Sequence, residues 1–153
     1  MSSESGTSEP ATVAATGFQV VFDTADPHRV AQFWADALGY QVEDSSKLVD
    51  QLVAAGQLPA AAVVQVDGHS AFAGLTACSD PNGVGPRLLF QLVPESKIVK
   101  NRVHLDLAVG EERVDDEVAR LTALGATYAW TSDDRGVRAV TMRDPEGNEF
   151  CVA

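Results

Sequence analysis

The sequence predicts an α+β fold: two tandem βαβββ modules that form one curved, mostly antiparallel eight-stranded sheet around a cleft. Two internal repeats support this prediction. The segment Ala37-Leu38-Gly39-Tyr40 recurs at 123–126, and the segment Asp80-Pro81-Asn82-Gly83 recurs at 144–147. A strand-like segment precedes each Leu-Gly pair at a similar distance. Because two copies are too few for a solenoid, they indicate a pseudo-twofold pair that encloses a cleft.

The first half begins with a strand at 17–23, where large apolar residues alternate with polar ones. A helix follows, because Asp26 can cap it, Pro27 suits its first turn and Gly39 suits its end. Phe33 and Trp34 lie on its apolar face. The pattern then predicts a strand at 40–43, a helix at 45–57 and strands at 61–66, 70–77 and 87–93.

The second half repeats this order after a connection at 94–102 that is rich in basic residues. It comprises a strand at 103–109, a helix at 111–124, a hairpin of 127–131 and 137–142 around the loop 132–136, and a strand at 149–152. Glu111 and Glu112 suit the start of the helix, where the helix dipole favours negative charge. The halves differ mainly by an insertion near 45–66.

Composition limits the classes of protein. Residues 1–15 are small and polar, which predicts a disordered tail, and 16–153 then forms a single domain of modules 16–97 and 98–153. The net charge of −11 argues against nucleic acid as a partner. No apolar run is long enough for a membrane span, and no secretory signal is present, so we expect a cytoplasmic protein. The two cysteines predict neither a zinc ribbon nor a disulfide framework.

Strand alternation also predicts which residues face the cleft. If Phe18, Leu92 and Val103 pack under the helices with the other apolar strand residues, the polar residues between them face the opposite side. Those residues are Gln19, Asp23, Arg87, Gln91, His104, Asp106, Glu149 and Cys151. Convergent polar groups in an apolar cleft are typical of small-molecule sites. The alternative is that these side chains simply face solvent.

Three stretches together resemble the vicinal oxygen chelate superfamily, which includes glyoxalase I, extradiol dioxygenases, and fosfomycin- and bleomycin-resistance proteins. They are the first strand and helix with Ala-Leu-Gly-Tyr, the segment Val-His-Leu-Asp-Leu at 103–107, and Asp-Pro-Glu-Gly-Asn-Glu-Phe-Cys-Val at 144–152. The connection and the start of the second module most resemble the glyoxalase-like subfamily. The resemblance implies two modules around one cleft, often within a homodimer.

Members of this superfamily that use a metal take one ligand from the first and last strand of each module, usually His or Gln, Glu, His and Glu. Carried over by position, the resemblance implies Gln19, Gln91, His104 and Cys151 here. Gln91 replaces a carboxylate, and Cys151 stands where the final Glu would be. Glu149 lies on the same face and would substitute only with a shift of register. We therefore expect either no cofactor or one divalent metal ion.

The remaining predictions concern catalysis and substrate binding. His104 with Asp106 could act as a general base, Gln19 and Gln91 could orient oxygens, and Arg87 could hold an anionic group. Glu149 and Trp130 could also contact a ligand. The alternatives are a surface His–Asp pair, an ordinary ion pair for Arg87 and an interface position for Trp130.

Two functions follow from these candidates. The first is a glyoxalase-like enzyme, distinct from classical glyoxalase I, that converts a small oxygenated or carbonyl-bearing metabolite by isomerase or lyase chemistry. The second is a metal-free protein that binds or sequesters a small molecule, as the bleomycin-resistance branch does in antibiotic resistance. A fold alone does not decide between them.

Overall fold

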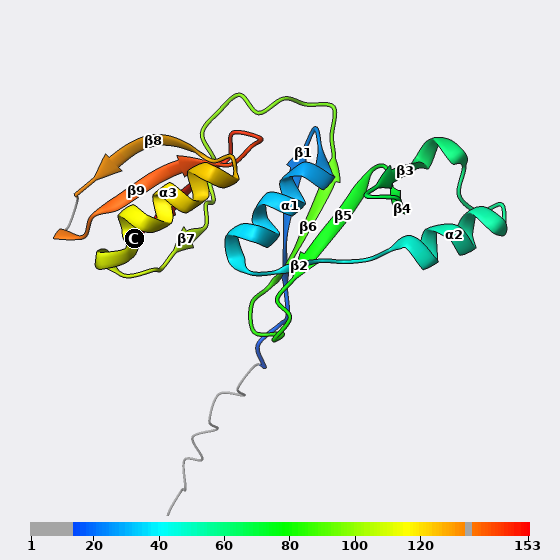
Figure 1. The fold of residues 1–153 in the computed structure, drawn as a ribbon, viewed down its shortest axis with the longest axis horizontal. Coiled ribbons are helices and arrows are strands. Elements are labelled where there is room, and N and C mark those ends of the chain that lie inside the picture. Colours follow the sequence, from blue (N-terminus) through cyan, green and yellow to red (C-terminus); the bar gives the residue numbers. More distant parts are fainter. Residues whose placement is uncertain (1–13, 134–135) are drawn as a thin grey trace, which may run out of the picture.

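The computed structural model describes residues 14–133 and 136–153 (Figure 1). It contains two four-stranded sheets, each with a helix, and Figure 1 shows them side by side, joined by the connection between β6 and β7. The first sheet has the order β1-β6-β5-β2, from β1 (Gln19–Thr24), β2 (Gln41–Val42), β5 (Leu75–Ser79) and β6 (Arg87–Leu92). The second has the order β7-β10-β9-β8, from β7 (Asp106–Leu107), β8 (Thr127–Ser132), β9 (Ala139–Arg143) and β10 (Glu149–Val152).

The predicted α+β class and the tandem plan are confirmed, but the eight strands are divided between two sheets rather than joined in one. In each module the first and last strands pair in parallel, and the other pairs are antiparallel. β7 is only 2 residues long, where a strand of 103–109 was predicted. The segment before β7 forms no strand, and in the part of the chain that the structure describes no hydrogen-bonded ladder joins β7 to β1.

Most predicted elements are present with small shifts. The helix α1 (Pro27–Leu38) has the predicted bounds: Asp26 accepts a bond from the Arg29 N–H at 3.2 Å, and Gly39 has a φ of 69°. The helix α3 (Val114–Leu124) starts late because a 3₁₀ turn occupies Glu111–Arg113. The predicted tail falls largely on residues 1–13, and the predicted hairpin loop includes 134–135; both ranges lie outside the described residues.

The insertion in the first module has its own small structure. It consists of the helix α2 (Ser46–Ala54), a 3₁₀ turn (Ala60–Ala62) and the hairpin of β3 (Val63–Val66) and β4 (His69–Phe72). The predicted single strand at 70–77 is therefore wrong. β4 ends at Phe72, β5 begins at Leu75, and the two strands belong to different sheets. Figure 1 shows the insertion at the end of the molecule away from the second module.

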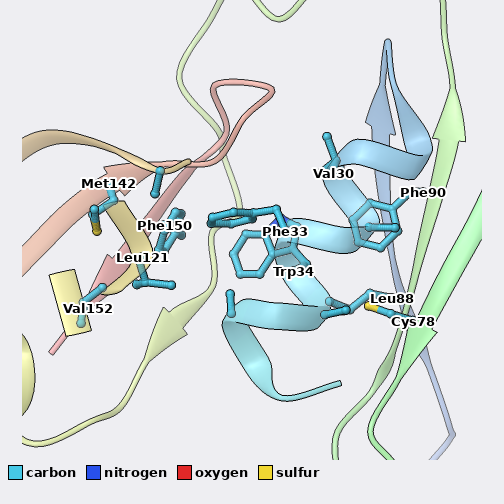
Figure 2. Close-up of a cluster of buried hydrophobic side chains, with 14 of the residues drawn as sticks. Val30, Phe33, Trp34, Cys78, Leu88, Phe90, Leu121, Met142, Phe150 and Val152 are labelled. Atoms are coloured by element: carbon cyan, nitrogen blue, oxygen red, sulfur yellow. The ribbon is translucent and has the colours of Figure 1, made fainter. Parts of the chain in front are cut away.

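One hydrophobic core joins the two modules, with α1 in the middle (Figure 2). The Trp34 ring lies 5.4 Å from the ring of Phe22 and 5.1 Å from that of Phe150, in the other module. Phe18, Leu92 and Val103 were predicted to pack but are 76%, 51% and 81% exposed. Phe18 and Val103 precede their strands and Leu92 ends β6, so the helices do not cover these three residues.

Hydrogen bonds also join the modules at the turn of 144–147. Asp144 is 3% exposed and accepts a bond from the indole N–H of Trp34 at 3.0 Å. Glu146 accepts bonds from the Thr24 hydroxyl at 3.0 Å and from the Ala25 N–H at 2.9 Å. The repeated turn thus fixes the second module against α1 and the end of β1. Among the described residues, no helix combines the length and apolar character that a membrane span needs.

Candidate functional site

A cleft of about 670 Å³ lies where the two modules meet. Its apolar wall is made by side chains of β1, α1, the approach to β7 and β10, and includes Phe22, Trp34 and Phe150. The polar part of the wall comes from β1, the connection and the 144–149 segment: Asp23, Glu95, Ser96, Lys97, Asn101, His104, Glu146, Asn148 and Glu149. The cleft therefore has the size and mixed lining of a small-molecule site.

His104 is the predicted catalytic residue that the structure places in the cleft wall. Its Nδ1 lies 2.7 Å from Oδ1 of Asp106, and its side chain is 37% exposed. The two residues are neighbours because alternate residues of the chain point to one side here. When Nδ1 carries the proton that Asp106 accepts, Nε2 keeps its lone pair and can take a proton from a bound molecule. Geometrically, the pair can thus act as an oriented base.

Glu149 also lines the cleft, but other groups of the protein already engage its carboxylate. Its Oε2 lies 2.9 Å from Lys97 Nζ and accepts the Asn101 N–H at 3.0 Å, while the side chain is only 8% exposed. Burial alone would raise the pKa of Glu149, but the bonds from Asn101 and Lys97 outweigh burial and lower this pKa to about 2. Glu149 therefore ties the connection to β10 as a permanent anion.

The predicted residues of the first module lie elsewhere. β1 and β6 pair in a register that sets Gln19 opposite Arg87 and Asp23 opposite Gln91. The Arg87 guanidinium binds both oxygens of Glu43 at 2.7 Å and the amide oxygen of Gln19 at 2.8 Å. Gln91 donates to Asp23 at 2.9 Å. Gln19, Arg87 and Gln91 are not among the residues that line the cleft.

The pKa shifts of Glu43 and Arg87 are those expected of a hydrogen-bonded ion pair. The hydrogen bond from Arg87 lowers the pKa of Glu43, against a smaller opposing effect of burial. The same bond raises the pKa of Arg87. Three of the five N–H donors of the guanidinium therefore bond to protein groups. Trp130, on β8, is 38% exposed and is not in the cleft lining either.

Some members of the superfamily that the sequence resembles use a metal, so the donor chemistry of the site matters. Donor atoms of His104, Asp106 and Cys151 all lie within 4.8 Å of one another. An imidazole, a carboxylate and a thiol fit a divalent ion of the zinc class, and three protein ligands leave a position open for substrate. An ion bound there would polarise a substrate oxygen. Gln19 and Gln91 are not part of this group.

Several cleft residues were missed at the level of sequence. Asn101 and Lys97 belong to a connection with no periodic pattern, so alternation could not place them. Asp23 was predicted to share the polar face of β1, and Glu146 is part of the repeated turn; both line the cleft. The repeat singled out the turn that contains Glu146, but the other copy, at 80–83, lies at the surface, so the repeat alone could not show that this turn lines the cleft.

The comparisons with known proteins agree with this fold. A family model described as a glyoxalase-like domain matches residues 19–153, and the chain belongs to this family. No curated protein matches the sequence. Solved structures that resemble the chain are less than 25% identical to it, so they support the fold alone.

Three solved structures illustrate the likeness. A mutant of the fosfomycin resistance protein FosX from Listeria monocytogenes, in complex with Mn(II) and 1S,2S-dihydroxypropylphosphonic acid, is 11% identical, covers 92% of this chain and 90% of its own, and has a TM-score of 0.58. A glyoxalase/bleomycin resistance protein/dioxygenase family enzyme from Burkholderia phytofirmans PsJN is 17% identical, with coverages of 88% and 94% and a TM-score of 0.56. The oxidase ChaP-H2 is 17% identical, with coverages of 92% and 93% and a TM-score of 0.54.

Proposed function

We propose that the protein binds a small oxygenated or carbonyl-bearing metabolite in the cleft and converts it by isomerase or lyase chemistry. The observation that supports this most directly is the placement of His104: it lines the cleft while Asp106 holds its Nδ1 at 2.7 Å. A proton on a carbon next to a carbonyl is acidic enough for an imidazole base to remove when the base is positioned. The enzyme would thus be a proton-transfer catalyst distinct from classical glyoxalase I.

The chain's own residues have separate parts in this proposal. His104 accepts the substrate proton at Nε2, and Asp106 orients the ring and stabilises the imidazolium that forms. Phe22, Trp34 and Phe150 give the cleft its apolar wall and exclude water from the reacting atoms. Gln19, Gln91 and Arg87 take no part in this proposal, because they do not line the cleft and each bonds to another residue of the first module.

The first prediction concerns His104. Metal-free protein, dialysed against a chelator, is incubated in D₂O with dihydroxyacetone and with glyceraldehyde, and C–H exchange is followed by proton NMR. We expect exchange above that of buffer, a loss of about 100-fold in His104→Gln and a smaller loss in Asp106→Asn, because a positioned base contributes about 10²–10⁴-fold.

His69→Gln is the matched control, because His69 is an exposed histidine on β4 outside the cleft. It should leave the exchange rate unchanged. An equal rate in His104→Gln and in the unmodified protein would show that His104 is not the base.

The hydrogen bonds that Arg87 and Gln91 make within the first module favour a second function, which is binding without catalysis. Since Arg87 is bound by Glu43 and Gln19, and Gln91 by Asp23, the first module offers the cleft few free polar groups for catalysis. A metal-free protein that binds or sequesters a small molecule fits this arrangement. Thermal stabilisation by a compound that shows no C–H exchange would favour this second function over the first.

We also propose that the protein assembles as a symmetric homodimer, the commonest arrangement of small soluble oligomers. Three apolar residues at or next to the connection support this, because Ile98 is 90%, Val99 74% and Val103 81% exposed. Sedimentation velocity should give twice the mass of 16.2 kDa, and Ile98→Asp should shift the protein toward the monomer. A single species at the monomer mass would contradict the proposal.

A further inference from the structure

Three side chains of the types that can bind a metal meet at the edge of the second sheet. Within residues 14–133 and 136–153, His104, Asp106 and Cys151 form a group whose donor atoms all lie within 4.8 Å of one another. They come from two adjacent strands or their immediate approach: His104 and Asp106 from the start of β7, and Cys151 from β10. The group is therefore contained in one module.

Backbone pairing builds this group. β7 and β10 run parallel with Asp106 opposite Cys151, and the Cys151 N–H donates to the Leu105 carbonyl at 2.9 Å. Since register partners in a sheet point to the same face, the carboxylate and the sulfur emerge on one side. His104 precedes Asp106 by two residues and shares that side, where its Nδ1 contacts the carboxylate at 2.7 Å.

The donors determine which ions fit. Cys151 supplies a sulfur that lies 3.5 Å from the Thr141 hydroxyl, and a bound ion would displace the thiol proton. Thiolate and carboxylate then offset the charge of a dication. Sulfur and imidazole favour Zn²⁺ and Co²⁺, whereas Mn²⁺ and Mg²⁺ prefer sites rich in oxygen. One carboxylate does not make an oxygen-rich site.

We propose that His104, Asp106 and Cys151 bind a divalent ion of the zinc class, with all three protein ligands from the second module and none from the first. This ligand set differs from the two-module set that the family resemblance implies. Gln19 and Gln91 stay outside it, because the register of β1 and β6 directs them to Arg87 and Asp23. The ion uses the imidazole, so the loaded protein cannot also use His104 as a free base.

The test is optical and needs no enzyme activity. Metal-free protein is titrated with Co²⁺, and the thiolate-to-cobalt charge-transfer band in the near ultraviolet is recorded together with the visible d–d bands. We expect one Co²⁺ per chain with a charge-transfer band that Zn²⁺ abolishes and that equal Mn²⁺ leaves intact. Cys151→Ser should remove the charge-transfer band and weaken Co²⁺ binding by about tenfold or more. His104→Ala should weaken Co²⁺ binding by a similar factor.

Cys78→Ala is the matched control, because this second cysteine is fully buried and burial raises the pKa of its thiol to about 12. The band should persist in this variant. Absence of a charge-transfer band, or a band that survives Cys151→Ser, would overturn the proposal. Equal weakening by Gln19→Ala and by His104→Ala would overturn the one-module set. The C–H exchange assay uses protein from which a chelator has removed any metal. The proposed enzyme activity and the proposed ion site can therefore be disproved independently.

Discussion

Asp144→Ala is expected to destabilise the protein by about 4 kcal/mol, the upper end of single-residue effects. The Asp144 carboxylate is 3% exposed and accepts four hydrogen bonds, from the Trp34 indole, the Glu146 N–H, the Asn148 N–H and the Asn148 side chain. Bonds to a charged acceptor contribute about 1.5–3 kcal/mol each, and the variant leaves the Trp34 N–H buried without a partner. Urea unfolding followed by circular dichroism measures the loss.

The repeat supplies the control. Asp80 holds the matching turn of the first module through the N–H groups of Asn82, Val84 and Gly85, but it contacts no tryptophan and its turn lies at the surface. Asp80→Ala should therefore cost clearly less than Asp144→Ala. Trp34→Phe should fall between them, since it removes one bond and keeps the ring. Equal losses at Asp80 and Asp144 would mean that the contact between modules contributes nothing.

The same two turns show what the sequence could predict. Asp-Pro-x-Gly specifies a turn by local chemistry, and both turns form. Local chemistry does not distinguish the two copies. Only the packing of α1 between the sheets brings Trp34 to Asp144 and makes one turn a structural joint.

At the candidate site, the sequence predicts which side of a strand a residue faces but not which residue lies opposite it. Alternation correctly placed His104 and Asp106 on one side of the chain, because side-chain alternation is a local property that needs no partner strand. The partner of each residue across the sheet depends on register, which packing and turns determine. The sequence therefore could not predict that Gln19 lies opposite Arg87, or that Gln91 lies opposite Asp23.

Lys97→Met is expected to destabilise the protein by about 3 kcal/mol, because it removes the nearest cation from a buried carboxylate and leaves the more distant Arg143 guanidinium, at 3.9 Å, to offset the charge. Lys97 Nζ lies 2.9 Å from Glu149, whose side chain is 8% exposed and whose pKa is lowered to about 2, so the carboxylate is ionised at neutral pH. The connection is held to β10 through this pair and the Asn101 N–H. Its loss should also increase proteolytic cleavage within 94–102. Lys100→Met is the matched control in the same connection, because Lys100 is exposed and donates a long hydrogen bond, 3.4 Å, to the Asn101 carbonyl.

A double-mutant cycle separates the charge from the shape of this pair. Glu149→Gln keeps the side-chain length and can still accept the Asn101 N–H, so the double variant Lys97→Met/Glu149→Gln contains no unpaired buried charge. We expect the double variant to be more stable than Lys97→Met alone, with a coupling of about 2 kcal/mol. Additive losses would show that the two side chains act independently. In that case the cleft wall formed by the connection would depend on the Asn101 bond and apolar packing, and the Lys97–Glu149 ion pair would have no structural role in it.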